Sequence, residues 1–138
     1  KPNFMELQVG VKILLNNEEG KYLLLRRSKK KYPEVMDIWD IPGGRIDPGV
    51  SLLENLKREM REEIELELKM EPKLIAAQDI MRIPGRHVVR LTYLGTIEGR
   101  PTLDAEENDE YKWFSREELG SLDGFDRYLK ELIDGKQI

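Results

Sequence analysis

Residues 43–66, with the sequence GGRIDPGVSLLENLKREMREEIEL, join a glycine turn to an acidic helix and organise the rest of the chain. Ser51 is followed three residues later by Glu54, a spacing that fits a capping box and predicts the start of a helix. Apolar residues then recur at spacings of three and four, which forms one stripe suited to packing against a core. The stripe consists of Leu52, Leu53, Leu56, Met60 and Ile64.

Three glutamates follow the border between this stripe and the solvated side of the helix. On a helical wheel Glu63 falls inside the edge of the stripe, where an unpaired carboxylate is costly. Glu59 lies beside it, and Glu62 lies one step further round. Crowded carboxylates raise one another's pKa, and a hard divalent cation such as Mg²⁺ relieves their repulsion. The pattern predicts a metal site; the alternative is a solvated helix face with pairs such as Arg58 with Glu62.

At this spacing the segment resembles the Nudix box, so the chain is similar to the Nudix hydrolases in their MutT-like branch. The box is a glycine, five residues, Glu, seven residues, Arg-Glu, an apolar residue, any residue, Glu-Glu, any residue, glycine and an apolar residue. Two of its positions differ here, because Val50 replaces the first Glu and Glu65 replaces the last Gly. The matching positions are Gly44, Arg58, Glu59, Met60, Glu62, Glu63 and Leu66.

The resemblance implies an α/β protein with the Nudix fold, a mixed β-sheet sandwiched between α-helices, in a single domain over residues 1–138. It also implies a metal-dependent pyrophosphohydrolase that cleaves a nucleoside diphosphate linked to another moiety by water attack on phosphorus. Glu59, Glu62 and Glu63 would hold Mg²⁺ or Mn²⁺ and, with Arg58, would form the catalytic set. Either Glu62 or Glu63 would orient the attacking water or accept its proton.

The resemblance suggests further site residues outside the acidic helix. The family uses a W-x-x-P-G-G segment to bring a backbone carbonyl to the metal, which here points to Gly43 and Gly44. An arginine pair that ends the second strand often faces the substrate, and Arg27 is the better match. The basic residues that follow are otherwise interpreted as a solvated loop. Trp39 is either a core aromatic or a lid over a base.

An acidic loop before the last predicted strand adds one candidate metal ligand. The family often supplies an acidic residue six positions before a tryptophan, and Glu107 holds that position relative to Trp113. Glu106 and Glu110 are near enough in the sequence to stay as alternatives. The single histidine, His87, has no second His or Cys as a metal partner, so we interpret it as structural or as a substrate contact.

The two departures from the box lead to two further expectations. Without glycine at position 65, a left-handed turn carries a steric cost, so we expect the helix to continue past Glu65 to Leu68 or Lys69. Valine at position 50 cannot pair with Arg58, so we expect Arg58 to pair with Glu54 or Glu62.

The remaining elements are predicted from alternating apolar patterns and turn signals. They follow the order β-β-α-β-β-β-α, with an additional short helix opened by a capping box at Ser115 and Glu118 and stopped by Gly120. A last helix containing Phe125 ends before Gly135. The predicted strands are residues 7–15 and 22–26, paired as a hairpin, and residues 74–81, 87–97 and 110–114.

Composition limits the partners that this chain can have. The 138 residues contain no cysteine, which excludes disulfides and thiolate zinc sites and suits a reducing cytoplasm. The formal net charge is −4 with both signs mixed, so no broad basic face for nucleic acid is expected. No signal peptide or membrane-spanning run is visible. We therefore expect a cytoplasmic monomer or homodimer that binds a small nucleotide, and neither nucleic acid nor membrane.

Two other functions stay open at this point. A Nudix-fold binding module that senses a nucleotide without turnover would tolerate the changes at Val50 and Glu65. A hydrolase of nucleotide sugars would share the same acidic helix, because the signatures of substrate choice lie outside the box.

Overall fold

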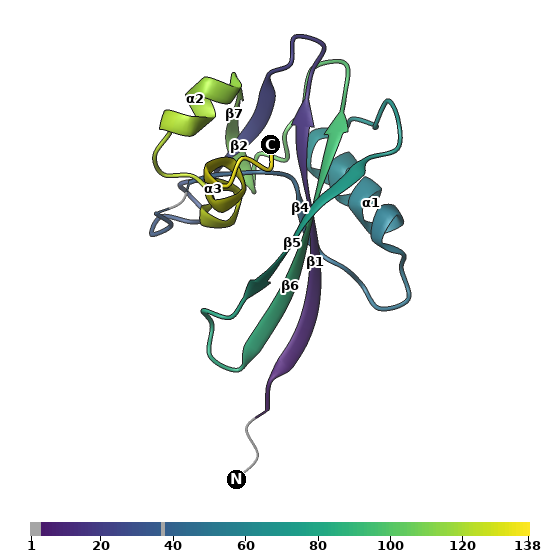
Figure 1. The fold of residues 1–138 in the computed structure, drawn as a ribbon, viewed down its shortest axis with the longest axis vertical. Helices are drawn as coiled ribbons and strands as arrows, with labels where there is room; N and C mark the ends of the chain where they lie inside the picture. The colour runs from purple at the N-terminus through teal and green to yellow at the C-terminus, as the bar shows by residue number, and fades with distance from the viewer. Residues whose placement is uncertain (1–3, 37) are drawn as a thin grey trace.

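The structure is a computed structural model that describes residues 4–36 and 38–138. Within these residues seven strands form one mixed sheet, accompanied by three helices (Figure 1). The strands are β1 (Glu6–Asn16), β2 (Tyr22–Arg27), β3 (Trp39–Asp40), β4 (Gly43–Arg45), β5 (Lys73–Ile80), β6 (Arg86–Thr96) and β7 (Asn108–Phe114). The helices are α1 (Leu52–Ile64), α2 (Arg116–Ser121) and α3 (Arg127–Asp134). None of the described helices is long and apolar enough to cross a membrane.

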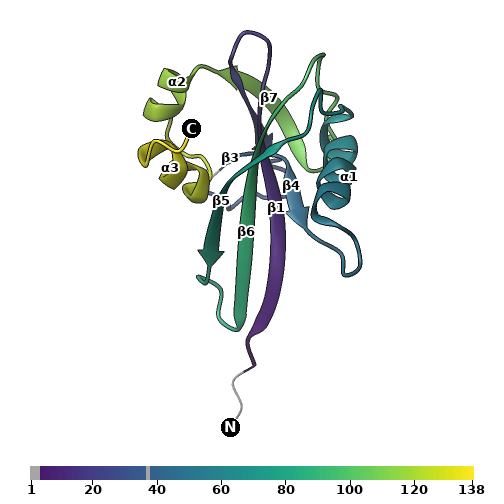
Figure 2. The ribbon, with the colours of Figure 1, turned by 45° about the vertical axis from the view of Figure 1, so that its right-hand side comes forward.

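The helices cover the sheet from two sides. Helix α1 lies on one side and helices α2 and α3 lie on the other, as both ribbon views show (Figures 1 and 2). One core cluster joins α1 to the sheet through Leu56, Met60 and Ile64, and a second joins α2 and α3 to it through Leu119 and Leu129. This is the predicted mixed sheet between helices.

The sheet splits into two halves between β1 and β2. Strand β1 pairs in parallel with β6 along its whole length, but with β2 only where Asn16 lies opposite Tyr22. Strand β2 instead pairs with β7 along its length. The predicted hairpin is therefore correct at its turn and wrong beyond it. There β1 pairs with β6, whereas β2 pairs with β7. Side chains from α1 and from residues 39–45 line the space between β1 and β2.

Residues 39–45 connect the two halves of the sheet. Strand β3 pairs with β2, whereas β4 pairs with β1, so the chain crosses from one half to the other at Pro42. These two short strands were not predicted. Gly43 is needed at the crossing, because its φ is 139° and a Cβ there would lie 2.1 Å from the carbonyl oxygen of Val11.

Helix α1 begins as predicted and ends earlier than predicted. The Ser51 side chain accepts a hydrogen bond from the Glu54 N–H at 3.2 Å. The expected extension to Leu68 or Lys69 is wrong: the helix ends at Ile64, and Glu65 takes the left-handed conformation with φ 56° and ψ 37°. This turn lets Leu66 and Leu68 pack against the core on the α1 side. Their burial offsets a cost of about 1–2 kcal/mol for a left-handed residue with a side chain.

The C-terminal helices follow the capping signals with two corrections. Both hydrogen bonds of the capping box form between Ser115 and Glu118. Gly120 does not stop α2, which continues through it to Ser121, because glycine weakens a short helix without breaking it. The last helix is shorter than predicted: Asp126 caps its start, so Phe125 lies before α3, and Gly135 closes the helix as predicted.

Candidate active site

A cavity of about 340 Å³ opens at the split in the sheet, between α1 and residues 39–45. It brings together most of the residues predicted from the sequence, including four acidic side chains and one arginine. Trp39, Gly44 and Arg58 are not among the residues that line it. The lining residues are Lys12, Leu25, Arg27, Asp40, Ile41, Gly43, Glu59, Glu62, Glu63, Asp104, Glu107 and Asn108, and we call this space the acidic cavity.

Glu63 is the most perturbed carboxylate of the cavity. One of its oxygens, Oε2, accepts the backbone N–H of Gly43 at 2.8 Å, which ties α1 to the crossing segment. Burial raises the pKa of Glu63 to about 7, and the charges of Glu59 and Asp40 act in the same direction. Lys12 and the Gly43 N–H oppose this shift without cancelling it. A carboxyl group therefore sits where ionisation is disfavoured, as its position inside the apolar stripe predicted.

Glu59 lies directly over Gly44. A Cβ at position 44 would lie 2.9 Å from Glu59 Oε2, so only glycine leaves the carboxylate its place. Burial raises the pKa of Glu59, and the neighbouring charge of Arg58 opposes that shift. The missing side chain of Gly44 thus leaves room for the Glu59 carboxylate.

Arg58 holds the acidic turn together from the outer side of α1. It pairs with Glu62 at 2.9 Å, as predicted, and not with Glu54. It also reaches Glu59 Oε1 at 3.1 Å and Asp47 Oδ2 at 3.3 Å. Asp47 belongs to the segment between β4 and α1, so Arg58 retains a brace to this segment although Val50 cannot provide one.

Asn55 is a residue of this site that the sequence reasoning missed. Its side chain is fully buried and its Oδ1 accepts hydrogen bonds from the Asp47 N–H at 3.1 Å and from Arg58 at 3.2 Å. Its amide group donates to the carbonyl of Arg45 at 3.4 Å. In the sequence Asn55 lies on the same border of the apolar stripe as Glu59 and Glu62, and a buried amide must find partners nearby.

Glu107 faces the cavity from the loop before β7, as the spacing from Trp113 suggested. The Tyr32 hydroxyl donates to its Oε2 at 2.6 Å and Lys31 forms an ion pair with it. These two contacts lower the pKa of Glu107. Lys31 of the basic loop thereby contacts the site while its side chain stays exposed to solvent. Glu106 and Glu110, the two alternatives to Glu107, do not line the cavity.

A buried ion network forms the wall opposite the glutamates, and the sequence reasoning missed two of its members. Asp40 Oδ2 lies 2.6 Å from Arg27 Nη2 and 3.1 Å from Lys12 Nζ, and Lys12 also donates to the carbonyl of Ile41 at 3.0 Å. Burial disfavours the ionised form of Asp40, but the charges of Lys12, Arg90 and Arg27 prevail and lower its pKa to about 2. The sequence did carry a signal for Lys12 and Asp40, because each is a charged residue among apolar neighbours. A charge that becomes buried needs an oppositely charged partner.

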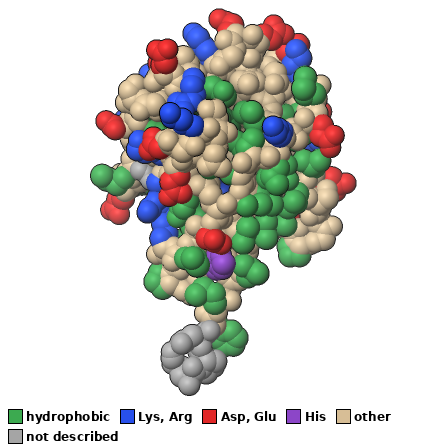
Figure 3. Space-filling view, in the orientation of Figure 1, with side chains coloured by type: hydrophobic (Ala, Val, Ile, Leu, Met, Phe, Trp, Pro, Cys, Tyr) green, Lys and Arg blue, Asp and Glu red, His purple; other side chains and the backbone are tan. Residues whose placement is uncertain are grey.

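Two other predicted residues lie away from the acidic cavity. Trp39 is 8% exposed and packs edge-on against Phe114, so the interpretation of Trp39 as a core aromatic is confirmed. His87, the only histidine and coloured purple in Figure 3, pairs with Asp79 across β5 and β6 at 2.7 Å and lines no part of the acidic cavity. This position favours the structural interpretation.

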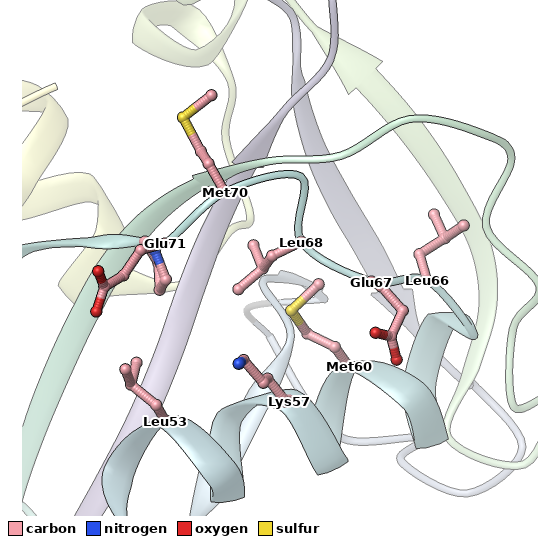
Figure 4. Close-up of a pocket in the computed structure, with 9 residues that line it drawn as sticks. Leu53, Lys57, Met60, Leu66, Glu67, Leu68, Met70 and Glu71 are labelled. Carbon is pink, nitrogen blue, oxygen red and sulfur yellow. The ribbon is translucent and has the colours of Figure 1, made fainter.

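A different kind of cavity lies on the other flank of α1. It measures about 240 Å³ and is formed by the helix and the segment after it, with Leu53, Met60 and Leu68 pointing into it (Figure 4). It shares no lining residue with the acidic cavity. Helix α1 therefore separates this cavity from the one that gathers the acidic residues.

The acidic cavity brings carboxylates and cations together around one space, an arrangement suited to a divalent ion together with a polyphosphate. In the described conformation the glutamate oxygens face protein donors, namely Arg58 and the Gly43 N–H. Among residues 4–36 and 38–138, no three His, Cys, Asp or Glu side chains are gathered as a ready ligand set.

Comparisons with known proteins agree with this geometry. The family model of the NUDIX domain matches residues 6–134. A putative 8-oxo-dGTP diphosphatase of Bacillus subtilis (strain 168) is 32% identical over 107 residues, which are 77% of this chain and 65% of that protein. An 8-oxo-dGTP diphosphatase of Buchnera aphidicola subsp. Schizaphis graminum (strain Sg) is 37% identical over 51 residues, which are 37% of this chain and 38% of that protein. The chain thus covers less than two thirds of each relative's length.

A solved structure carries the same fold. The crystal structure of a MutT protein from Methanosarcina mazei Go1 superposes with a TM-score of 0.77 and 26% sequence identity, over 95% of this chain and 93% of that one. The match of the family model extends over nearly the whole described chain and includes the acidic helix and the crossing segment. The chain is therefore a MutT-like member of the Nudix family.

Proposed function

We propose that this chain is a metal-dependent pyrophosphohydrolase that cleaves the diphosphate bond of a nucleotide derivative by water attack on phosphorus. The observation that carries the proposal is the acidic cavity, in which Glu59, Glu62, Glu63 and Glu107 face Lys12 and Arg27. The names of the two bacterial relatives support a nucleoside triphosphate as the first substrate to test. We also propose that residues 1–138 form one domain, a view supported by the match over residues 6–134.

The donor set fits Mg²⁺ or Mn²⁺, because carboxylate and carbonyl oxygens are the hard ligands that these ions prefer. Glu59, Glu62 and Glu63 would supply the carboxylates, with Glu107 and the backbone carbonyls of Gly43 and Gly44 as further donors. When bound, the ion would neutralise charge on the bridging phosphates and lower the pKa of a coordinated water.

The protein residues have separate tasks in this proposal. Arg58 holds Glu59 and Glu62 in place and would release them to the ion. Lys12 and Arg27 carry positive charge on the opposite wall, where they would fix the polyphosphate. Glu62 or Glu63 would orient the attacking water or accept its proton.

The non-catalytic binding module is not favoured. A module without turnover has no need for crowded carboxylates that burial destabilises, yet Glu59 and Glu63 are both held in such positions. The nucleotide-sugar hydrolase remains an outcome of the substrate test.

The test is hydrolysis of 8-oxo-dGTP, the normal nucleoside triphosphates and nucleotide sugars, each with Mg²⁺ and with Mn²⁺. Glu62→Gln and Glu63→Gln should each lower the rate by orders of magnitude while the circular dichroism spectrum stays unchanged. Glu54→Gln is the matched control on the solvated side of the same helix and should keep full activity. Equal activity of the Glu62 and Glu63 variants with wild type would overturn the proposed site.

Hydrolysis in ¹⁸O-labelled water tests which bond breaks. Attack on phosphorus places the label in a phosphate-containing product. Label found only in the sugar or alcohol product would show attack on carbon and contradict the proposed reaction.

A further inference from the structure

A second cavity of about 290 Å³ adjoins the acidic cavity on the side of α3. The two cavities share Lys12, Arg27 and Asp40, so the buried ion network is a common wall between them. Gly43 lines one cavity and Gly44 lines the other. A molecule whose diphosphate occupies the acidic cavity can therefore extend past this wall into the second space, which we call the basic cavity.

The charged side chains of the basic cavity are mostly cationic. Asp40 and Asp126 are its two acids, against five cations, which leaves a formal charge of +3. Asp40 is paired with two of the cations, and Asp126 lies 2.7 Å from Arg90. Among the described residues, Arg45 and Arg82 have no acidic side chain within ion-pair distance. The cations are Lys12, Arg27, Arg45, Arg82 and Arg90.

Arg90 is buried inside this cavity and ion-paired there. Its side chain is 5% exposed, and its Nη2 is close to Asp126 Oδ2 without the alignment of a hydrogen bond. Within the described chain this buried Nη2 has no hydrogen-bond partner. Because the Asp126 carboxylate neutralises Arg90, most of the excess positive charge of the cavity comes from Arg45 and Arg82.

The only aromatic ring in the lining is not free to stack on a base. Tyr128 is 6% exposed, and the guanidinium groups of Arg82 and Arg90 lie 5.5 and 5.6 Å from its centroid. Arg127 approaches the same ring at 5.5 Å from outside the cavity lining. The cavity therefore offers guanidinium N–H groups and positive charge in place of an open aromatic surface.

We infer that the basic cavity binds a phosphate group carried by the part of the substrate beyond the scissile diphosphate. The inference rests on the proposed function, because it assigns the diphosphate itself to the acidic cavity. Arginine forks suit phosphate oxygens, and the excess charge of the cavity favours a group with more than one negative charge. Such a group is either a phosphomonoester on a sugar or the terminal phosphate of a longer polyphosphate chain.

Two matched pairs of probes test the inference and separate these sources. ADP-ribose and its 2′-phosphorylated form differ only in a sugar phosphate, and ATP and adenosine 5′-tetraphosphate differ only in chain length. Calorimetric titration with Ca²⁺ in place of Mg²⁺ keeps a hard cation on the diphosphate, and assay of the products afterwards checks that little hydrolysis has occurred. We expect the added phosphate to tighten binding about tenfold in at least one pair, as one good arginine contact provides. A gain in the first pair indicates a phosphosugar, and a gain in the second indicates a polyphosphate.

The variants identify the cavity responsible. Arg82→Gln should reduce the gain to about twofold, because it removes one of the two cations without an acidic partner. Arg127→Gln is the matched control, since Arg127 contacts the same tyrosine ring without lining the cavity, and it should keep the gain. Equal binding within both pairs overturns the inference, and so does a gain that Arg82→Gln leaves intact. Hydrolysis of the substrate panel with Mg²⁺ tests the proposed function, whereas the binding gain assesses the basic cavity separately.

Discussion

Gly44 shows how a residue without a side chain determines the place of a carboxylate. Its backbone φ is not in the left-handed region, so alanine would fit the local backbone. The obstacle is Glu59, whose Oε2 would lie 2.9 Å from the new Cβ. Because that atom is at the end of a flexible side chain, the carboxylate moves more easily than the strand does.

Gly44→Ala should therefore leave the fold intact and displace Glu59. We expect a loss of no more than about 1 kcal/mol in the free energy of unfolding and a fall in Mg²⁺ affinity of about tenfold or more, typical of a disturbed ligand shell. Urea unfolding and metal titration by calorimetry measure the two effects. Gly120→Ala, in α2 and away from the site, is the control and should leave metal affinity unchanged. A Gly44→Ala protein with normal metal affinity would show that Glu59 is not a ligand.

At the scale of a secondary-structure element, the end of α1 is a compromise between backbone strain and core packing. Glu65 adopts φ 56° and its N–H donates to the Met60 carbonyl at 3.1 Å. The sequence carries no glycine there to relieve the strain, yet Leu66 and Leu68 must turn inward to reach the core. The helix accepts a strained cap because continuing straight would leave two leucines outside the core on the α1 side.

Glu65→Gly should stabilise the protein, because glycine adopts the left-handed conformation without the steric cost. The expected gain is about 1 kcal/mol in the free energy of unfolding, or about 2–4 °C in Tm for a chain of this size. Thermal unfolding in EDTA measures it apart from metal binding. Glu65→Ala removes the same charge but keeps a Cβ, so it should bring no comparable gain. Equal stabilisation by both variants would mean that charge, and not the backbone, limits the wild type.

At the scale of the whole molecule, a single buried aspartate links the two halves of the split sheet. Asp40 lies in β3, Arg27 in β2 and Lys12 in β1, and these three side chains meet where β1 and β2 have separated. Strands β1 and β2 do not pair directly across this gap, so the ion network adds side-chain contacts to the backbone pairing of β3 and β4. The same side chains form the wall between the acidic and basic cavities.

The depressed pKa of Asp40 predicts a specific loss of stability in acid. Its pKa falls from 3.8 in the unfolded chain to about 2 in the folded protein, so its contribution is full above pH 4 and disappears as the pH falls through 2. The shift corresponds to about 2 kcal/mol of folding free energy. Asp40→Asn leaves Lys12 and Arg27 without a buried counter-charge and should cost about 3 kcal/mol at pH 7.

Urea unfolding of wild type and Asp40→Asn at pH 7, 4 and 2.5 measures this effect. The difference between the two proteins should be largest at pH 7 and should shrink between pH 4 and 2.5. Asp109→Asn is the control, because Asp109 is also ion-paired, with Arg26, but at the surface, where such pairs contribute about 1 kcal/mol or less. A difference that is the same at all three pH values would mean that the Asp40 charge is not the cause.

The sequence alone predicted what depends on neighbours along the chain. Ser51, Ser115 and Gly135 marked helix ends correctly because capping is a local hydrogen-bonding choice. Helix periodicity alone placed Glu63 at the edge of the apolar stripe, where a carboxylate is costly, and the crowding of carboxylates predicted its raised pKa, of which burial is the larger cause. The acidic helix and its resemblance to the Nudix box then predicted the family, which the comparisons confirmed.

Only the tertiary structure decided what depends on contacts between distant segments. Lys12 and Asp40 are far apart in the sequence and meet because β1 and β2 separate after a single paired position. No local sequence pattern predicts that β1 and β2 will pair with other strands beyond their turn. The early end of α1 at Glu65 has the same origin, because the burial of Leu66 and Leu68 by other elements overrides the local preference of the backbone. Local periodicity therefore fixed the acidic wall of the site, and long-range strand pairing supplied its cationic wall.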